Sequence, residues 1–272
     1  MNKPNLPDLP SLSEVKDGVR DHMSDVRDSM SEVREGVRES IADAREDAKA
    51  LLESVKPKLR GWLHLVMAPL ALIAGIVLIA ISKTTAGRVG AIVFTITAVL
   101  LFGTSAIYHR GNWSPRTAIT LRRMDHANIF LIIAGTYTPF ALTLLPAAEA
   151  RSLLILVWSG ALLGVCFRVF WTGAPRWLYV PVYLALGWVA VFYIKPMLHG
   201  GGPAVLALII TGGALYSIGA IIYGTKRPNP SPRWFGFHEI FHTFTILAFA
   251  VHYVAASLAV TGHDVTASTL LH

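Results

Sequence analysis

The stretch HEIFHTFTILAFAVHYVAASLAV, from His238 to Val260, combines two features that decide how this chain folds. Its last 18 residues contain no Asp, Glu, Lys or Arg, and they are long enough to cross the apolar core of a bilayer as a helix. Its first five residues place two histidines one helical turn apart, with a carboxylate between them. The stretch therefore predicts a membrane-spanning helix whose first turn carries ionisable groups.

The same apolar character extends over most of the chain. Of 272 residues, 53% are hydrophobic, which is too apolar for an ordinary soluble domain and indicates a polytopic membrane protein. Residues 1–60 hold 13 of the 17 acidic residues and carry a net charge of about −2, whereas the rest carries about +9. This basic excess, Arg168 near the end of the fourth apolar segment included, is interpreted as loop charge and not as a nucleic-acid surface.

Seven apolar segments of about 20 residues follow residue 61, and we expect each of them to cross the membrane. Lys and Arg are more frequent in the loops on the side of the N-terminus, which places the N-terminus in the cytoplasm and the C-terminus outside. The sequence thus predicts an all-α protein, a seven-transmembrane helix bundle that passes through the plasma membrane. The expected spans are 62–82, 88–109, 124–145, 152–171, 177–197, 203–223 and 239–260.

Three domains are expected: a charged N-terminal extension at residues 1–60, the transmembrane domain at 61–262 and a short C-terminal tail at 263–272. No apolar segment precedes residue 62, so a cleavable signal peptide is not expected. The lone cysteine, Cys166, cannot form an intramolecular disulfide.

The N-terminal extension has a repeat of its own. Residues 1–12 are rich in Pro and Ser, and we expect them to be disordered. In residues 14–55 apolar side chains recur in steps of 4, 3 and 4, an 11-residue repeat typical of a straight amphipathic helix or a right-handed coiled coil. Gly18 and Gly36 weaken this helix prediction. Three interpretations stay open: a helix on the lipid surface, a helix that self-associates, and a solvated tether.

Polar residues at the ends of three expected spans share one depth. His109 ends the second span with Ser105 one turn deeper, Asp125 opens the third, and His238 and His242 open the seventh. In the predicted topology all five lie near the cytoplasmic face. Ionisable groups inside a membrane are costly, so their agreement in depth predicts a functional site.

The residue types suit a metal ion. His238 and His242 share one helix face, and His109 could complete a set of three imidazoles. Such a set leaves a zinc ion's charge unneutralised and one position open for water, whose pKa falls to about 7. Asp125 would serve as general base or hold this water, and Ser105 would donate a hydrogen bond to a substrate or a developing oxyanion. The alternative is a set of unrelated helix-end groups.

Four further residues receive weaker predictions. Glu239 projects about 100° from His238, so we expect it to cap its helix or pair with an arginine. His126 neighbours Asp125 but points elsewhere, and His252 is expected to be a packing histidine that could line a cavity. The role of His64 is left open.

Three segments together resemble a known family. They are SAIYH (Ser105–His109), DHANIFLIIAGTYTPF (Asp125–Phe140) and HEIFHTFTILAFAVHY (His238–Tyr253), and they resemble the hemolysin III branch of the progestin and adipoQ receptor family over about residues 58–260. The resemblance implies a seven-helix fold with a cytoplasmic N-terminus and, in bacteria, an inner-membrane location. It also implies a zinc ion bound by His109, His238 and His242, with Asp125 holding the zinc-bound water beside the motif serine Ser105.

The wider superfamily includes alkaline ceramidases, so the resemblance implies a zinc-dependent hydrolase of lipid amides that serves membrane lipid homeostasis. Membrane lipids are then the expected partners. Two other functions stay open: a receptor-like sensor in which zinc is structural, and a pore-forming hemolysin. A single polar cluster disfavours a pore, which needs polar lining through the whole bilayer.

Overall fold

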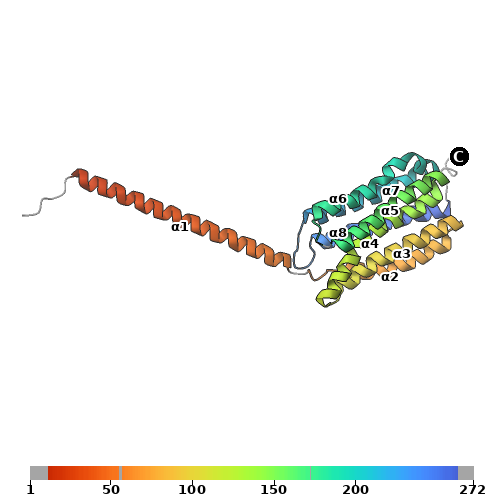
Figure 1. Cartoon of the computed structure of the whole chain (residues 1–272), viewed down its shortest axis with the longest axis horizontal. Helices are drawn as coiled ribbons and strands as arrows, with labels where there is room; N and C mark the ends of the chain where they lie inside the picture. Colours follow the sequence, from red (N-terminus) through yellow and green to blue (C-terminus); the bar gives the residue numbers. More distant parts are fainter. Residues whose placement is uncertain (1–11, 55–56, 172, 263–272) are drawn as a thin grey trace, which may run out of the picture. The chain divides into compact units, whose positions relative to one another are not determined.

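The structure, a computed structural model, describes residues 12–54, 57–171 and 173–262 (Figure 1). The described residues are helical almost throughout, as predicted, and they contain no β-strand beyond an isolated bridge between Ser231 and Phe235. The chain divides into two compact units, residues 1–55 and 56–272. The expected disordered segment at residues 1–12 and the expected tail at 263–272 lie outside the described residues, apart from residue 12.

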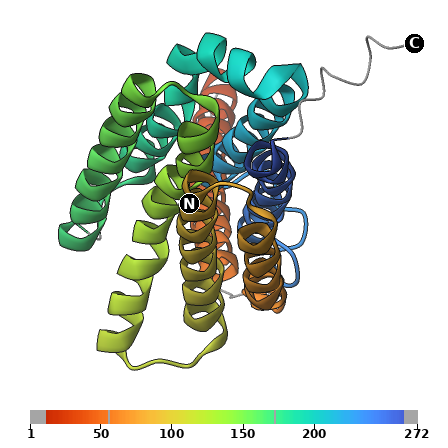
Figure 2. The ribbon, with the colours of Figure 1, turned by 90° about the vertical axis from the view of Figure 1, so that its right-hand side faces the viewer.

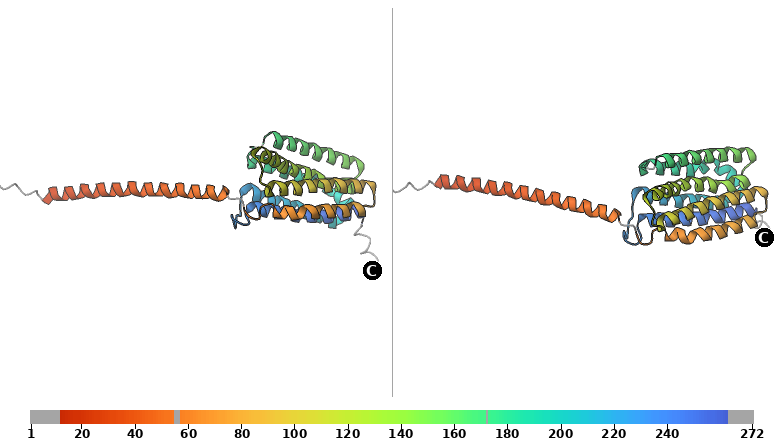
Figure 3. Two further views of the ribbon diagram at one scale, coloured as in Figure 1. Left: turned by 90° about the horizontal axis from the view of Figure 1, so that it is seen from below. Right: turned by 60° about the horizontal axis from the view of Figure 1, so that its bottom comes forward.

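The first unit consists of one long helix, α1 (Leu12–Ser54), shown in red and orange in Figure 3. The helix predicted from the 11-residue repeat is therefore present. Gly18 and Gly36 lie inside it without ending it. Each glycine lowers the stability of a helix by up to about 1 kcal/mol relative to Ala. In α1 this cost is spread over 43 residues, and the helix continues through both glycines.

The second unit is a bundle whose helices run alongside one another (Figure 2). Six helical segments among the described residues are long and apolar enough to cross a membrane, and the chain is therefore a multi-pass membrane protein. Five of these segments are single helices, and the sixth is the continuous run Arg176–Thr225. The single helices are α2 (Trp62–Ile81), α3 (Thr85–Arg110), α4 (Pro115–Leu144), α5 (Ala147–Phe170) and α8 (Phe237–Thr261).

The run Arg176–Thr225 contains two of the expected spans, 177–197 and 203–223. It comprises α6 (Arg176–Gly187), the 3-10 helix η1 (Trp188–Tyr193) and α7 (Ile194–Thr225). A straight helix of its 50 residues would be about 75 Å long, more than twice the apolar thickness of a bilayer. The run is not straight, because Gly202 has φ 71° and ψ 175° and breaks the helix before Pro203.

Contacts between the two halves of this run show that it folds back on itself. The hydroxyl groups of Tyr179 and Tyr223 lie 3.2 Å apart, although 44 residues separate them. Trp188 donates an indole hydrogen bond to Ser217 at 2.9 Å. The left-handed φ of Gly202 is a conformation that residues other than glycine rarely adopt, so this residue permits the reversal.

One helix boundary differs clearly from its prediction. The third span was expected to begin at residue 124, but α4 begins nine residues earlier, at Pro115. The Ser114 hydroxyl accepts a hydrogen bond from the Thr117 amide at 3.3 Å, and proline is favoured at the first helical position. Hydropathy misses this first part of α4 because it is polar.

Helices α3 and α4 pack backbone against backbone. A Cβ atom added at Gly90 of α3 would lie 2.5 Å from the Cα of Pro139 of α4. Likewise, a Cβ added at Gly135 of α4 would lie 2.0 Å from the hydroxyl of Thr97 of α3. Small residues at such crossings are typical of membrane helices, whose association depends on close packing. This packing sets the position of α3 beside α4 and therefore of the polar groups at their ends.

We expect Gly90→Ala to lower the free energy of unfolding by about 1–3 kcal/mol, because the added methyl group meets rigid backbone. The matched control is Gly103→Ala on the same helix, where a Cβ atom meets nothing within 4 Å. Thermal unfolding of the two purified variants in detergent measures the difference. Equal stability of both variants would contradict the close α3–α4 packing.

Candidate metal centre

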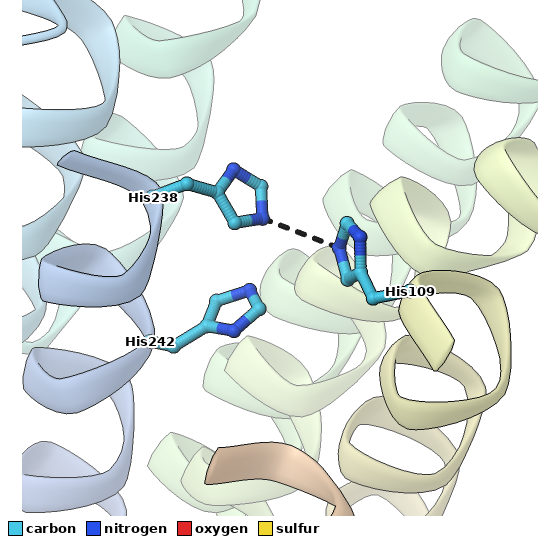
Figure 4. A group of neighbouring side chains, drawn as sticks. All are labelled: His109, His238 and His242. Atoms are coloured by element: carbon cyan, nitrogen blue, oxygen red, sulfur yellow. Dashed lines mark hydrogen bonds between the residues drawn. The ribbon is translucent and has the colours of Figure 1, made fainter. Parts of the chain in front are cut away.

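Three histidines converge between the end of α3 and the start of α8 (Figure 4). His109 comes from the last turn of α3, and His238 and His242 come from the first two turns of α8. Their side chains are buried, with exposed fractions of 6%, 9% and 2%. The structure thus brings together the three residues that were predicted as metal ligands.

The distances within this cluster fit a tetrahedral ion. The Nε2 atoms of His109 and His238 lie 3.2 Å apart. Two nitrogens that each lie about 2.0–2.1 Å from a tetrahedral zinc ion are about 3.3–3.4 Å from one another. One ring nitrogen from each of the three histidines lies within 4.8 Å of the others, which is close enough for one ion to be shared by the three rings.

The ring of His242 is held in place by a residue that the sequence left open. His64 of α2 stacks on His242 with ring centroids 3.7 Å apart and an interplanar angle of 14°. Among the described residues, both ring nitrogens of His64 and the Nδ1 of His242 are buried without a hydrogen-bond partner. Buried polar atoms without partners are rare, and they indicate a ligand or another function at this position.

Asp125 and Ser105 border the same cluster. The Oδ2 atom of Asp125 in α4 lies 3.8 Å from the Nε2 atom of His109. Ser105 lies one turn before His109 on α3, and its side chain interacts with the Asp125 carboxyl group. Both residues are buried. The acid and the serine that the sequence predicted at this site are therefore beside the three histidines.

One cavity of about 210 Å³ begins at this cluster and continues into the bundle. Its polar end is lined by Ser105, Asp125, His238 and His242, and it extends along α8 as far as His252. The ten residues from His242 to His252 correspond to about 15 Å of helix. The wall between these ends is mostly aliphatic and aromatic. A polar end and a long apolar wall suit a molecule with one polar group and a hydrocarbon chain.

Glu239 both caps its helix and pairs with an arginine, the two roles expected from its position. Its Oε1 atom accepts a hydrogen bond from the Arg60 guanidinium at 2.7 Å, and its Oε2 atom accepts one from the Gly236 amide at 2.8 Å. The side chain is 1% exposed. Glu239 therefore joins the segment before α2 to the first turn of α8, where two of the histidines lie.

A second polar network lies beside the first, and sequence reasoning missed most of it. Arg168 was counted as loop charge, which is wrong, because its side chain is only 1% exposed. It donates to His126 Nδ1 at 3.0 Å and lies over the Tyr179 ring at 4.3 Å. An arginine cannot accept, so His126 carries its proton on Nε2 and donates to the Tyr223 hydroxyl at 3.2 Å. His126 thus points away from the three histidines, as expected.

His252 packs against a glycine at the far end of the cavity. Its Nδ1 atom lies 3.0 Å from the Ala248 carbonyl oxygen, as in a hydrogen bond within α8. A Cβ atom at Gly212 of α7 would lie 2.3 Å from the His252 ring. His252 is therefore both a packed histidine and part of the cavity wall.

The chain is similar to a known protein family and to individual members of it. The family described as haemolysin-III related matches residues 52–253, which is most of the chain. The hemolysin-3 homolog of Bacillus subtilis (strain 168) is 34% identical over 154 residues, which cover 57% of this chain and 69% of that protein. Hemolysin-3 of Bacillus cereus is 30% identical over 178 residues, which cover 64% of this chain and 78% of that protein. All five predicted site residues lie inside the matched region.

Loss of the Arg60–Glu239 ion pair is expected to loosen the start of α8. Glu239→Gln keeps the shape and an acceptor for the Gly236 amide, so it should cost about 1–3 kcal/mol of unfolding free energy through the unpaired Arg60. Glu239→Ala loses both contacts and should cost more. Thermal unfolding of the two variants and of Arg60→Met measures these costs.

A double variant, Arg60→Met with Glu239→Gln, provides the control for this pair. Because each single change leaves a buried or half-buried partner without its counterpart, the double variant should recover part of the loss. Strictly additive losses would show that the two side chains do not depend on one another.

Proposed function

The chain belongs to the haemolysin-III related family. We propose that it is a zinc-dependent hydrolase, embedded in the membrane, that cleaves an amide bond of a membrane lipid. The ligands would be His109, His238 and His242. The observation that carries this proposal is the convergence of three buried imidazoles, two of which, His238 and His242, line the polar end of an apolar cavity. We further propose that it lies in the plasma membrane, the inner membrane of a bacterium.

The donor set determines which chemistry such an ion would supply. Zinc bound by three neutral histidines keeps an open position, polarises a carbonyl group and activates water for attack. His64 holds the His242 ring by stacking, and so keeps one ligand oriented. Arg60 and Glu239 fix the first turn of α8, and so keep His238 and His242 on the side facing His109.

Asp125 would handle the proton in amide hydrolysis. Its carboxylate borders the ligand His109, where it can accept the proton of the attacking water and pass it to the nitrogen as the C–N bond breaks. Ser105 would donate a hydrogen bond to the carbonyl oxygen as negative charge develops there. Both residues line the cavity, so both can reach a bound substrate.

The shape of the cavity supports a lipid as substrate. Its apolar wall can hold an acyl chain of a lipid amide, with the amide group placed at the polar end beside the three histidines. The apolar wall also disfavours a pore, because a conducting path needs polar lining along its whole length.

We further propose that the chain crosses the membrane seven times, with its N-terminus in the cytoplasm and its C-terminus outside. The run Arg176–Thr225 would account for two of these crossings, separated by the break at Gly202. The hydrogen bonds between its two halves support this assignment. The three histidines would then lie near the cytoplasmic face.

A structural role for the ion is the second candidate, and one observation favours it. The proposed ligands His109 and His238 lie 129 residues apart along the chain, so an ion bound by both would cross-link α3 to α8. In a receptor-like sensor this cross-link alone would be the purpose of the site. Asp125 would then be dispensable for function.

Purified protein is expected to contain about one zinc ion per chain, because three imidazoles and a water complete a tetrahedral site. His238→Ala/His242→Ala should lose this zinc, whereas His199→Ala, at an exposed histidine, should retain it. Metal analysis after dialysis measures the ratio. Equal zinc in all three proteins would contradict the assignment of the ligands.

Asp125→Asn separates the catalytic from the structural role. We expect this variant to retain its zinc but to hydrolyse a lipid amide about 10²-fold more slowly or worse, because the general base is lost. Release of fatty acid from a ceramide with the zinc-loaded protein is the measurement. Zinc-loaded wild type without turnover on any lipid amide would leave the structural role as the better explanation.

The proposed seven crossings predict at which positions of the chain a fused reporter enzyme is active. A phosphatase that is active only outside the cytoplasm should be active when fused after Gly201 and inactive when fused after Asn229, because α7 would separate these positions. Activity at neither site would show that the run Arg176–Thr225 does not cross the membrane twice.

A further inference from the structure

An exposed apolar stripe follows α1 in the first unit. Its members are 47–68% exposed and recur in steps of 4, 3, 4 and 4. At about 100° per residue they fall within about 80° of one another, and an 11-residue repeat keeps such a stripe straight along the helix. Five apolar side chains on one narrow line are costly in water. They are Val26, Met30, Val33, Val37 and Ile41.

The two borders of this stripe carry opposite charges. By the same geometry, one border lies about 80–120° from Val26 and is basic, and the other lies about 100–140° away on the opposite side and is acidic. All six charged side chains are exposed. The basic border consists of Arg27, Arg34 and Arg38, and the acidic border consists of Asp25, Glu32 and Glu39.

We propose that α1 pairs in parallel, along this stripe, with α1 of a second copy of the chain. A two-fold axis parallel to the helices brings the basic border of each helix to the acidic border of the other, so attraction occurs on both sides of the seam. An antiparallel pair would bring basic to basic and acidic to acidic. The charge pattern therefore favours one partner, the same chain, in one orientation.

A lipid surface fits this helix less well. Helices that lie on membranes carry Lys and Arg on the polar face and Trp, Phe or Leu on the apolar face. Here one whole border is acidic, and Asp28 and Glu35 on the far face add further negative charge, which anionic lipids repel. Residues 12–54 contain no Trp, Phe or Tyr. Two copies inserted in one membrane with the same topology also present α1 in parallel.

Charge reversal in the full-length protein in liposomes tests the pairing. The background is Cys166→Ala with Val33→Cys in the stripe, and the readout is the fraction of disulfide-linked dimer after diamide oxidation. Glu32→Lys/Glu39→Lys gives both borders a net positive charge, so the dimer fraction should fall at least about fivefold. The control, Asp28→Lys/Glu35→Lys, changes the net charge equally on the far face and should leave the fraction unchanged.

Mixing complementary variants tests the charge pairing directly. Arg34→Glu/Arg38→Glu, which gives both borders a net negative charge, should also lose the dimer. Co-expression with Glu32→Lys/Glu39→Lys should restore it as a heterodimer. Equal cross-linking by the border and far-face variants, or no rescue on mixing, would overturn the proposal.

The position of single cysteines tests the orientation. Differently tagged chains with Val26→Cys and Ile41→Cys should form 26–26 and 41–41 links but no 26–41 link, since these positions lie about 22 Å apart along a helix. A dominant 26–41 link would overturn the parallel arrangement. Failure to cross-link, with Val33→Cys shielded by lipid from a water-soluble maleimide, would assign the stripe to the membrane surface and overturn the dimer.

Discussion

Two of the three converging histidines depend on where α8 begins, and the partly buried ion pair between Arg60 and Glu239 fixes that point. The carboxylate of Glu239 binds the guanidinium with one oxygen and the Gly236 amide with the other, so α8 is both capped and joined to the segment before α2. In the rotation of α8 that has this contact, His238 and His242 face His109. The carboxylate inside the H-E-x-x-H stretch is therefore a positioning group.

The cluster itself is costly without a ligand. Three buried imidazoles, a fourth that stacks on one of them, and a buried carboxylate lie together where apolar packing would be less costly. Both ring nitrogens of His64 and the Nδ1 atom of His242 have no partner among the described residues, so hydrogen bonding offsets only part of this cost. A bound cation would satisfy three of these rings at once, which is the physical reason to propose one here.

Much of this arrangement could be predicted from the sequence, and the exceptions have physical reasons. The spacing of His238 and His242 and the shared depth with His109, Asp125 and Ser105 were sufficient to predict that these five residues lie close together. The positions of Arg168, His64 and Tyr223 could not be found in this way, because hydropathy gives the depth of a residue but not the rotation of its helix. Arg168 near a helix end looks like loop charge until α5 is seen to turn it inward.

The boundaries show a related limit. Apolar windows locate the part of a helix that lies in lipid, so they missed the polar start of α4 at Pro115, which a serine cap and a proline mark instead. They also divided the run Arg176–Thr225 into two spans without showing that a break at Gly202 lets its halves contact each other. The local hydropathy pattern locates the apolar helices, whereas contacts between residues far apart in the sequence determine how these helices pack.

X-ray absorption at the zinc edge of the purified, zinc-loaded protein tests the central claim most directly. The arrangement of His109, His238 and His242 predicts three imidazole nitrogens at about 2.0–2.1 Å with one further light ligand, and two imidazoles in His109→Ala. A six-oxygen shell, a sulfur ligand or an unchanged spectrum in His109→Ala would contradict a metal centre built from these three histidines.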